Sequence, residues 1–253
     1  MTDNSSDNLA VIILAAGQGK RMLDPSKAKV MYPLAGKPLI QHVLETAEQL
    51  SKNIYIIVGY QKESVIDFVN SFGKDFNIVE QKEQLGTGHA VAQTESLLRN
   101  FTGDILILCG DVPNLSYKTL LQFIENHQTE SADISVLSTI ADNPYGYGRI
   151  IRNEKLEFLK ITEEKDASPE EKDVSEINSG VYLVKSNLLF PALHKVSNRN
   201  AQGEYYLTDI IEILRNENAK VYAFPDADFG ETSGVNSPDD LKNAESYFFK
   251  NHE

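Results

Sequence analysis

The sequence predicts an α/β fold with a doubly wound, mostly parallel sheet that is flanked by helices and extended by a small antiparallel addition. Short β-branched apolar runs alternate with amphipathic segments of helical length through most of the chain, which is the pattern of parallel strands linked by helices. From Pro144 onward the strands become shorter and the loops more frequent, as expected of antiparallel strands that carry a second binding wall.

The expected elements follow one another in chain order. Strands are expected at 10–16, 54–59, 77–81, 104–111 and 133–139, and helices near 39–50, 62–71, 87–99 and 116–127. The later part is expected to hold strands within 146–153, 156–162 and 177–185, a solvated acidic stretch at 163–176, and helices at 208–218 and 237–251. Ser237 is the expected N-cap of the last helix, with Pro238 at its first position.

Charge and cysteine content narrow the function classes. The formal net charge of −13 argues against nucleic acid or an anionic membrane as a partner. Cys109 is the one cysteine, which excludes an internal disulfide and a cysteine-based metal cluster and fits a reducing compartment. No run approaches the roughly 18 apolar residues of a spanning helix, and the polar start does not resemble a signal peptide. We therefore expect a soluble, cytoplasmic protein.

A basic island interrupts this acidic chain. Between residues 20 and 37 five cations face the single acid Asp24, a net charge of +4; the cations are Lys20, Arg21, Lys27, Lys29 and Lys37. Beside a glycine loop, such an island indicates a small, highly charged anion as ligand. A solvated basic surface is the alternative.

The glycine loop "LAAGQGKRM" at 14–22 follows an apolar strand and matches neither common phosphate motif. A dinucleotide fingerprint requires a third glycine where Met22 stands. A Walker loop requires a glycine five residues before Gly-Lys and Ser or Thr after it, which neither Gly19-Lys20 nor Gly36-Lys37 provides.

What remains is a loop whose backbone N–H groups can approach a nucleoside triphosphate. Arg21 and Lys29 could neutralise its β- and γ-phosphates, since Arg offers a planar fork and Lys a mobile point charge. A tight turn with scattered cations is the alternative.

Asp111 ends the apolar strand "DILILCGD", and so lies at the carboxyl edge of the expected sheet, where open α/β folds place their ligands. It is well placed to hold Mg²⁺, which prefers oxygen ligands. A turn aspartate before Val112-Pro113 is the alternative.

A third glycine loop, "EQLGTGHAVAQ" at 83–93, precedes a helix with Thr87 as the expected N-cap. Its backbone could accept a nucleobase edge, with the Gln81 amide reaching the same ring. A plain strand-to-helix connection explains the glycines as well, and we interpret His89 as a structural helix residue.

Taken together, the motifs resemble bacterial N-acetylglucosamine-1-phosphate uridyltransferase. They occur in that family's order and approximate spacing from about residue 9 to the final helix: "LAAGQGKRM", "AKVMYPLAGKPLIQHV", "EQLGTGHA", "CGDVP", "YGRI", "EEKDA", "EINSGVY", "NAQGEYYLTDII" and "GVN". The segments "QLGTGHA" and "GEYYLTDI" are the most specific.

The resemblance implies the nucleotide-diphospho-sugar transferase fold, which is glycosyltransferase-A-like, and a set of site residues. The implied catalytic residues are Arg21 and Lys29; the implied nucleotide contacts are Leu14, Ala15, Ala16, Gly17, Gly19, Gln81, Gly86 and Thr87. The implied Mg²⁺ ligands are Asp111 and Asn236, and the implied sugar-phosphate contacts are Gly148, Glu163, Asn178, Tyr206 and Thr208. For three of these last residues simpler explanations stay open: a turn for Gly148, a solvated loop for Glu163 and a helix cap for Thr208.

The implied organisation is a flexible tail at 1–8 and one domain at 9–253. The domain divides into a nucleotide-binding part at about 9–140, a sugar-binding part at about 141–236 and a C-terminal helix at about 237–251. Bifunctional members of the family continue into a hexapeptide-repeat β-helix with acetyltransferase activity, which we do not expect here. Lys20, Ala28 and Cys109 replace the residues that the family usually has at these places.

The expected reaction joins UTP and N-acetylglucosamine 1-phosphate to form UDP-N-acetylglucosamine and pyrophosphate, with Mg²⁺ as cofactor. The expected assembly is a monomer or a weak homo-oligomer. Alternatives are the same chemistry with another sugar 1-phosphate or nucleotide, a non-catalytic sugar-nucleotide sensor, and, as the weakest, a dehydrogenase.

Overall fold

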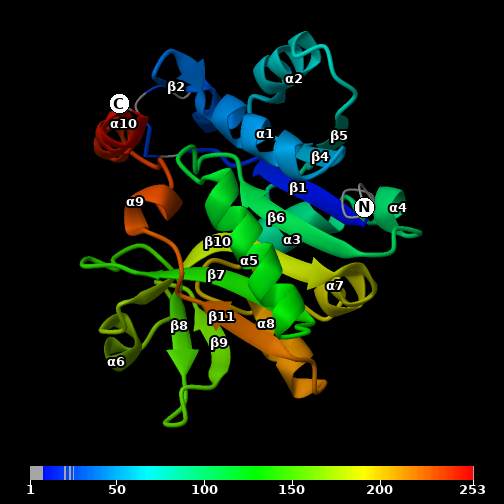
Figure 1. Ribbon diagram of the computed structural model, residues 1–253, viewed down its shortest axis with the longest axis vertical. Coiled ribbons are helices and arrows are strands. Elements are labelled where there is room, and N and C mark those ends of the chain that lie inside the picture. Colours follow the sequence, from blue (N-terminus) through cyan, green and yellow to red (C-terminus); the bar gives the residue numbers. More distant parts are fainter. Residues whose placement is uncertain (1–7, 20, 23, 25, 253) are drawn as a thin grey trace.

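In the described part of the chain, nine strands form one mixed sheet (Figure 1). The computed structural model describes residues 8–19, 21, 22, 24 and 26–252. The strands of this sheet are β1 (Leu9–Ala15), β4 (Asn53–Val58), β5 (Asn77–Glu80), β6 (Asp104–Cys109), β7 (Ile134–Ile140), β8 (Arg149–Arg152), β9 (Phe158–Thr162), β10 (Glu176–Lys185) and β11 (Val221–Phe224). Their order is β11-β7-β10-β6-β1-β4-β5, and β8 joins β10 to β9.

The four strands β5, β4, β1 and β6 are parallel to one another. Parallel strands covered on both faces consist of nearly continuous apolar runs, and Val11, Ile12 and Ile13 in β1 are all fully buried. The predicted parallel part of the sheet is therefore confirmed.

The antiparallel addition is also confirmed. Strand β10 runs antiparallel to β6 and β7, and the β8–β9 hairpin pairs with its first half. A register shift separates Asn178 from Val181. Here Gly180 has a φ of +81°, a backbone conformation that glycine adopts without steric cost.

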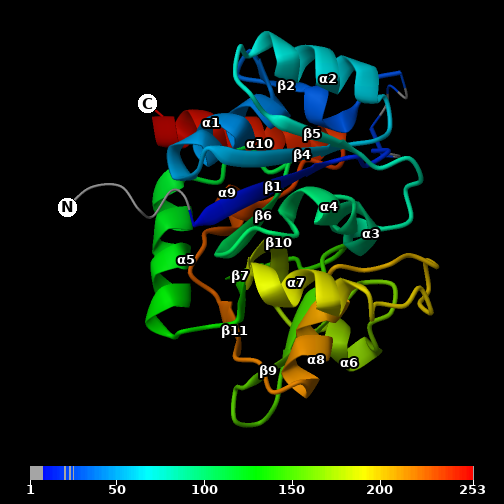
Figure 2. The ribbon, with the colours of Figure 1, turned by 90° about the vertical axis from the view of Figure 1, so that its right-hand side faces the viewer.

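Helices cover both faces of the sheet (Figure 2). On one face lie α1 (Leu39–Leu50), α2 (Lys62–Ser71) and α5 (Tyr117–Thr129), and on the other lie α3 (Thr87–Ala92), α4 (Glu95–Leu98), α7 (Ser186–Leu193) and α8 (Asp209–Asn216). Side chains that alternate along β1 enter two separate cores, with Ile12 in one and Ile13 in the other. This arrangement is the doubly wound form that the sequence predicts.

The remaining elements lie at the periphery. They are the 3₁₀ helix η1 (Lys29–Met31), the two-stranded sheet of β2 (Pro33–Leu34) and β3 (Lys37–Pro38), and the helices α6 (Pro169–Lys172), α9 (Phe229–Thr232) and α10 (Pro238–His252). Leu34, Leu39 and Ala244 form a small core that holds α10 against the β2–β3 segment. Within the described ranges, none of the helices is long and apolar enough to span a membrane.

Two of the predicted elements differ in the structure. The helix expected at 87–99 divides into α3 and α4, because the Thr94 hydroxyl and N–H both bond to the Val91 carbonyl, at 2.7 and 3.0 Å, and tighten the chain there. The acidic stretch at 163–176 is not only a solvated loop, since it contains α6, which a capping box at Ser168 and Glu171 starts. The predicted start of the last helix is confirmed: α10 begins at Pro238, and the Asp240 N–H donates to the Ser237 hydroxyl at 3.2 Å.

The Gly180→Ala substitution is expected to lower the free energy of unfolding by about 2–4 kcal/mol, through left-handed backbone strain and overpacking. A Cβ there would lie 2.8 Å from the Cys109 sulfur. Gly73→Ala is the matched control, because Gly73 has a φ of +69° but open space around it, so only about 1–2 kcal/mol should be lost. Urea unfolding measures both; equal losses would contradict the contact with Cys109.

Candidate active site

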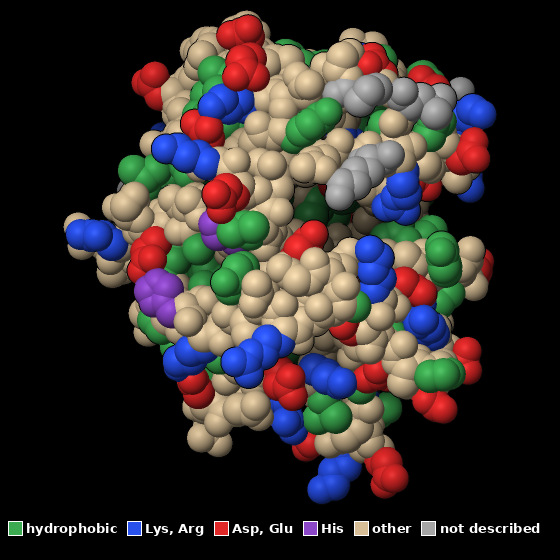
Figure 3. Space-filling model, turned by 180° about the vertical axis from the view of Figure 1, so that it is seen from behind, with side chains coloured by type: hydrophobic (Ala, Val, Ile, Leu, Met, Phe, Trp, Pro, Cys, Tyr) green, Lys and Arg blue, Asp and Glu red, His purple; other side chains and the backbone are tan. Residues whose placement is uncertain are grey.

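The neighbouring strands β1 and β6 end at the same edge of the sheet. Leu14 pairs with Cys109, and the Gly110 N–H donates to the Leu14 carbonyl at 2.9 Å. The carboxyl end of β1 points toward the face shown in Figure 3, where the surface is hollowed near its centre. Open α/β sheets place their ligands at this edge.

The glycine loop leaves β1 at this edge. Ala15 and Ala16 are buried, whereas Gly17 is exposed, and a Cβ on Gly17 would meet open space. Gly17 therefore presents bare backbone to solvent just after the end of β1. Lys20 lies outside the described residues.

Within this loop, Gly19 packs against Lys29. Gly19 has a φ of +57°, a backbone conformation that favours glycine. A Cβ at this position would also lie only 2.9 Å from the Lys29 Cβ, so a larger residue would crowd the lysine. Arg21 is exposed. The packing places the stem of Lys29 at the end of β1.

Three predicted site residues meet in one contact. The Lys29 ammonium donates to the Asp111 carboxylate and, at 2.9 Å, to the Asn236 amide oxygen. The Lys29 and Asp111 side chains are only 15% and 14% exposed. Lys29 precedes α1, Asp111 follows β6 and Asn236 precedes α10, so the fold brings together three remote chain segments.

Backbone bonds hold the two segments that carry these oxygens. The Val235 N–H donates to the Asp111 carbonyl at 2.9 Å. The Asn236 amide nitrogen donates to the Gly234 carbonyl at 3.2 Å, which leaves its oxygen facing Lys29. A carboxylate and an amide oxygen directed at one cation are donors that suit a hard divalent ion. Among the described residues, no group of three or more His, Cys, Asp or Glu side chains is arranged to hold a metal.

The predicted nucleobase residues form a second group, at the start of α3. The buried Gln81 amide donates to the Gly86 carbonyl at 3.1 Å and lies 3.0 Å from the His89 Nδ1. Thr87 is not the N-cap: Gly86 holds that position with a φ of 113° and no side-chain cap. The Thr87 hydroxyl instead accepts the Leu207 N–H at 3.0 Å.

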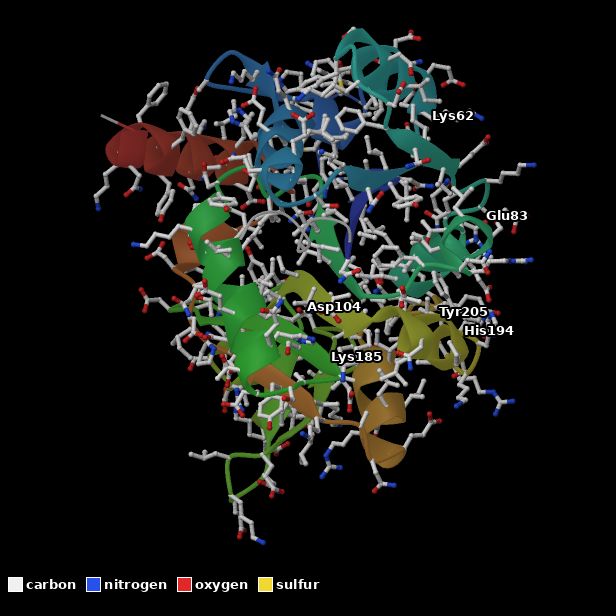
Figure 4. All side chains as sticks on the ribbon, turned by 45° about the vertical axis from the view of Figure 1, so that its right-hand side comes forward. Lys62, Glu83, Asp104, Lys185, His194 and Tyr205 are labelled. Carbon is white, nitrogen blue, oxygen red and sulfur yellow. The ribbon has the colours of Figure 1, made fainter. Side chains whose placement is uncertain are left out.

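Tyr205 connects this group to the neighbouring Tyr206 and Thr208, two of the predicted sugar-phosphate residues. Its carbonyl accepts the Gly88 N–H at 2.8 Å, and its own N–H donates to the Leu85 carbonyl at 2.8 Å. A Cβ on Gly86 would lie 2.6 Å from the Tyr205 carbonyl oxygen, so this glycine permits a close backbone approach. Figure 4 shows Tyr205 on the side of the molecule that carries α3.

The predicted sugar-phosphate residues also gather. The Thr208 hydroxyl donates to Glu163 at 3.2 Å, and a Cβ on Gly148 would lie 3.6 Å from the Glu163 carboxylate and 3.6 Å from the Asn178 Cβ. Asn178 donates from its amide to the Tyr182 hydroxyl at 2.7 Å, and its oxygen accepts the Gly180 N–H at 2.9 Å. The Thr208 side chain does not cap α8, so that simple explanation fails.

Tyr206 faces a different partner. Its hydroxyl lies 3.2 Å from the Asp166 carboxylate, which also accepts the Ala201 N–H at 2.8 Å. The segments 163–166 and 200–208 therefore hold each other through hydrogen bonds. Both carry residues that the sequence assigns to the sugar phosphate.

Sequence reasoning missed two residues that connect these groups. Burial raises the pKa of the Tyr147 hydroxyl, and the nearby Ser233 side chain and Gly234 backbone oppose this effect, so the turn before Gly148 reaches the segment that carries Asn236. Arg149 is 2% exposed and donates to the Tyr147 carbonyl and, at 2.7 Å, to Glu164. Both lie in the quoted motif "YGRI", where a buried arginine could not be recognised from spacing alone.

Acidic side chains surround Glu163, one of the predicted sugar-phosphate residues. Burial raises the pKa of Glu163, and the nearby charges of Asp209, Asp166 and Glu204 add to the effect, while the Thr208 hydrogen bond opposes it. Burial likewise raises the pKa of Asp209 to about 6. A buried carboxyl without a cation partner favours its neutral form.

Comparison with known proteins decides the class. A family model described as Nucleotidyl transferase matches residues 10–247. The chain belongs to the nucleotidyl transferase family. It is accordingly a nucleotidyltransferase-type enzyme, and the resemblance inferred from its motifs is confirmed.

Curated relatives from the nucleotidyl transferase family are bifunctional GlmU proteins. The protein from Bacillus licheniformis is 44% identical over 243 residues, which cover 95% of this chain and 52% of the relative. The protein from Geotalea daltonii is 47% identical over 229 residues, which cover 90% of this chain and 50% of the relative. The chain thus spans about half the length of the curated relatives it matches.

Solved structures share the fold. UDP-glucose pyrophosphorylase complexed with UDP-glucose has a TM-score of 0.76 at 22% identity and covers 96% of this chain and 99% of its own. A putative glucose-1-phosphate thymidylyltransferase from Bacillus anthracis has a TM-score of 0.71 at 22% identity, with 94% of each chain covered. The predicted architecture is thereby confirmed at the level of fold.

Asp209→Asn is expected to raise the Tm by about 2 °C at pH 7 and by less at pH 4. Burial raises the folded-state pKa of Asp209 from 3.8 to about 6, so the stability that this carboxyl contributes is complete below pH 3.8 and is lost as the pH rises through 6. The gain is small because the side chain is only half-buried. Thermal unfolding at the two pH values measures it, with the exposed Asp67→Asn as control; a lower Tm at pH 7 would contradict this assignment.

Proposed function

We propose that this chain transfers the uridylyl group of UTP to N-acetylglucosamine 1-phosphate and releases pyrophosphate, with Mg²⁺ as cofactor. The family assignment supports nucleotidyl transfer, and the match to GlmU proteins supports this sugar among the alternatives. The observation that carries the proposal is the convergence of the Asp111 and Asn236 oxygens on one cation beside the glycine loop.

The nucleophile of the proposed reaction needs no general base. A phosphate monoester has a second pKa of about 6. An oxygen of the sugar 1-phosphate is therefore anionic at neutral pH and can attack the α-phosphorus of UTP in line. The pyrophosphate group leaves from the opposite side. The work of the site is then to position two anions and stabilise the charge of the leaving group.

Cationic side chains meet this demand in the proposal. Arg21 is exposed at the glycine loop, where its guanidinium can bind the β- and γ-phosphates, and Lys29 reaches the same region from η1. A Mg²⁺ ion held by Asp111 and Asn236 would supply a further positive charge to the phosphate oxygens.

The two further groups of residues fit the two substrates. In the proposal, Gln81, Gly86 and Thr87 contact uracil at the start of α3 as part of a nucleotide-binding part at about 9–140. Gly148, Glu163, Asn178, Tyr206 and Thr208 line the sugar-phosphate site in the part at about 141–236. The hydrogen bond between Thr87 and Leu207 supports this, because it links the two groups directly.

The cellular setting is part of the proposal. The net charge of −13 and the single cysteine support a cytoplasmic enzyme without nucleic-acid or membrane partners. A monomer or a weak homo-oligomer is proposed.

Pyrophosphate release by the purified protein tests the function. Five nucleotides (UTP, dTTP, CTP, GTP and ATP) are combined with the 1-phosphates of glucose, N-acetylglucosamine and N-acetylmuramic acid in the presence of Mg²⁺. The expected result is a clear preference for UTP with N-acetylglucosamine 1-phosphate. Preference for another pair would contradict the proposed substrates. If the folded protein releases no pyrophosphate with any pair, the sensor alternative would be favoured.

Arg21→Ala is expected to lower turnover by at least about a hundredfold, the effect of losing one preorganised charge-stabilising donor. Steady-state pyrophosphate release measures it. Arg99→Ala removes an equally exposed arginine away from the glycine loop and should leave the rate unchanged. A near-normal rate for Arg21→Ala would remove this residue from the mechanism.

Asp111→Asn is expected to raise the Mg²⁺ concentration needed for half-maximal rate by at least about tenfold, because one charged oxygen ligand is lost. A Mg²⁺ titration of the rate measures this shift. Asp104→Asn is the control, since Asp104 begins the same strand that Asp111 follows. An unchanged Mg²⁺ dependence would rule out Asp111 as a ligand.

A further inference from the structure

Lys29 lies where the proposed metal ion would bind. Its ammonium bonds to both proposed ligand oxygens, those of Asp111 and Asn236. The Lys29 and Asp111 side chains are both more than four-fifths buried, so this contact differs from an exposed surface pair, which stabilises a protein little.

The surroundings hold the lysine in this position. Its stem packs on Gly19, where no Cβ could fit. Its two partners are themselves held by backbone bonds, the Val235 N–H to the Asp111 carbonyl and the Asn236 amide to the Gly234 carbonyl. The pair of oxygens therefore already converges, with an ammonium between them.

An ammonium and a divalent cation cannot occupy the same pair of oxygens. For a metal ion to bind in the absence of nucleotide, it must break the contacts of Lys29 and leave a positive charge beside itself. A triphosphate offers the ammonium a new partner of higher charge, and so frees the oxygens. Each ligand thereby favours the binding of the other.

We propose that Lys29 is a positioning residue for the metal pocket: in the nucleotide-free protein its ammonium takes the place of the metal between Asp111 and Asn236, and its release couples metal binding to nucleotide binding. The inference rests on the proposed function for the identity of the two ligands. Beyond the proposed function, the inference assigns the coupling between metal binding and nucleotide binding to one side chain, Lys29.

Such coupling is reciprocal, so it can be measured from either ligand. Metal must strengthen nucleotide binding by the same factor by which nucleotide strengthens metal binding. Couplings of this kind commonly amount to about 5–150-fold. If Lys29 carries the coupling, its removal must strengthen metal binding in the absence of nucleotide while reducing the coupling factor.

The test measures binding of Mn²⁺ to the full chain without nucleotide, by electron paramagnetic resonance of the free ion. We expect Lys29→Met and Lys29→Gln to bind Mn²⁺ at least about tenfold more tightly than the unmodified protein. Lys27→Met is the matched control: it removes one charge from the same segment, but Lys27 lies over the Tyr32 ring, 5.0 Å from its centroid. The control should bind Mn²⁺ as the unmodified protein does.

A second measurement gives the coupling factor. UTP affinity is determined by calorimetry with no metal and with saturating Mn²⁺, in the absence of sugar phosphate so that no turnover occurs. The ratio of the two affinities should be at least about fivefold larger for the unmodified protein than for either Lys29 variant. Thermal unfolding verifies that each variant is folded.

The outcomes separate the two proposals. If the unmodified protein binds Mn²⁺ in the presence of UTP but neither folded Lys29 variant binds it more tightly alone, the role of Lys29 is overturned and the proposed metal site stands. An equal gain in Mn²⁺ affinity in Lys27→Met would also overturn the role of Lys29, because the loss of any nearby positive charge would then explain the tighter binding. If the unmodified protein binds no Mn²⁺ even with UTP, the metal site and this inference both fail.

Discussion

The contact of one buried ammonium with two oxygens organises the carboxyl edge of the parallel strands, where the candidate site lies. Lys29, Asp111 and Asn236 are far apart in the sequence, and different backbone contacts bring their segments together. The parallel pairing of β1 with β6 brings the glycine loop beside Asp111, and a backbone bond from Val235 brings the segment before α10 to the same place. The ion pair of Lys29 with Asp111 and the hydrogen bond from Lys29 to Asn236 then hold the three side chains together, in a place where water screens the ion pair little.

The other site residues are connected to this contact by a chain of neighbours. Tyr147 reaches Gly234 from the turn that carries Gly148. The Cys109 thiol lies 3.6 Å from the Gly180 carbonyl, at the register shift of β10. The irregular part of β10 therefore packs against the end of β6, two residues before Asp111.

Much of this was predictable from local patterns. The apolar runs predict the strands, and the strand-end position of Asp111 predicts its place at the sheet edge, because parallel strands end together. The break after Ala92 depends on the Thr94 hydroxyl, which donates to the carbonyl of Val91 three residues earlier. The buried Arg149 donates to nearby Tyr147 and to two other segments, at Glu164 and Lys172. Local patterns do not reveal the contacts of Arg149 with Glu164 and Lys172, because these partners are 15 and 23 residues away in the chain. For the same reason the motifs identified Lys29 and Asp111 separately, but not that they would form an ion pair.

We propose that the oxygens of Asp111 and Asn236 form a cation pocket from which nucleotide releases Lys29. Anomalous X-ray diffraction from crystals of the protein grown with Mn²⁺ and UTP tests it directly. The expected result is an anomalous peak between these two side chains, with the Lys29 ammonium moved to the triphosphate. A metal peak bound elsewhere, with Lys29 still on Asp111 and Asn236, would contradict it.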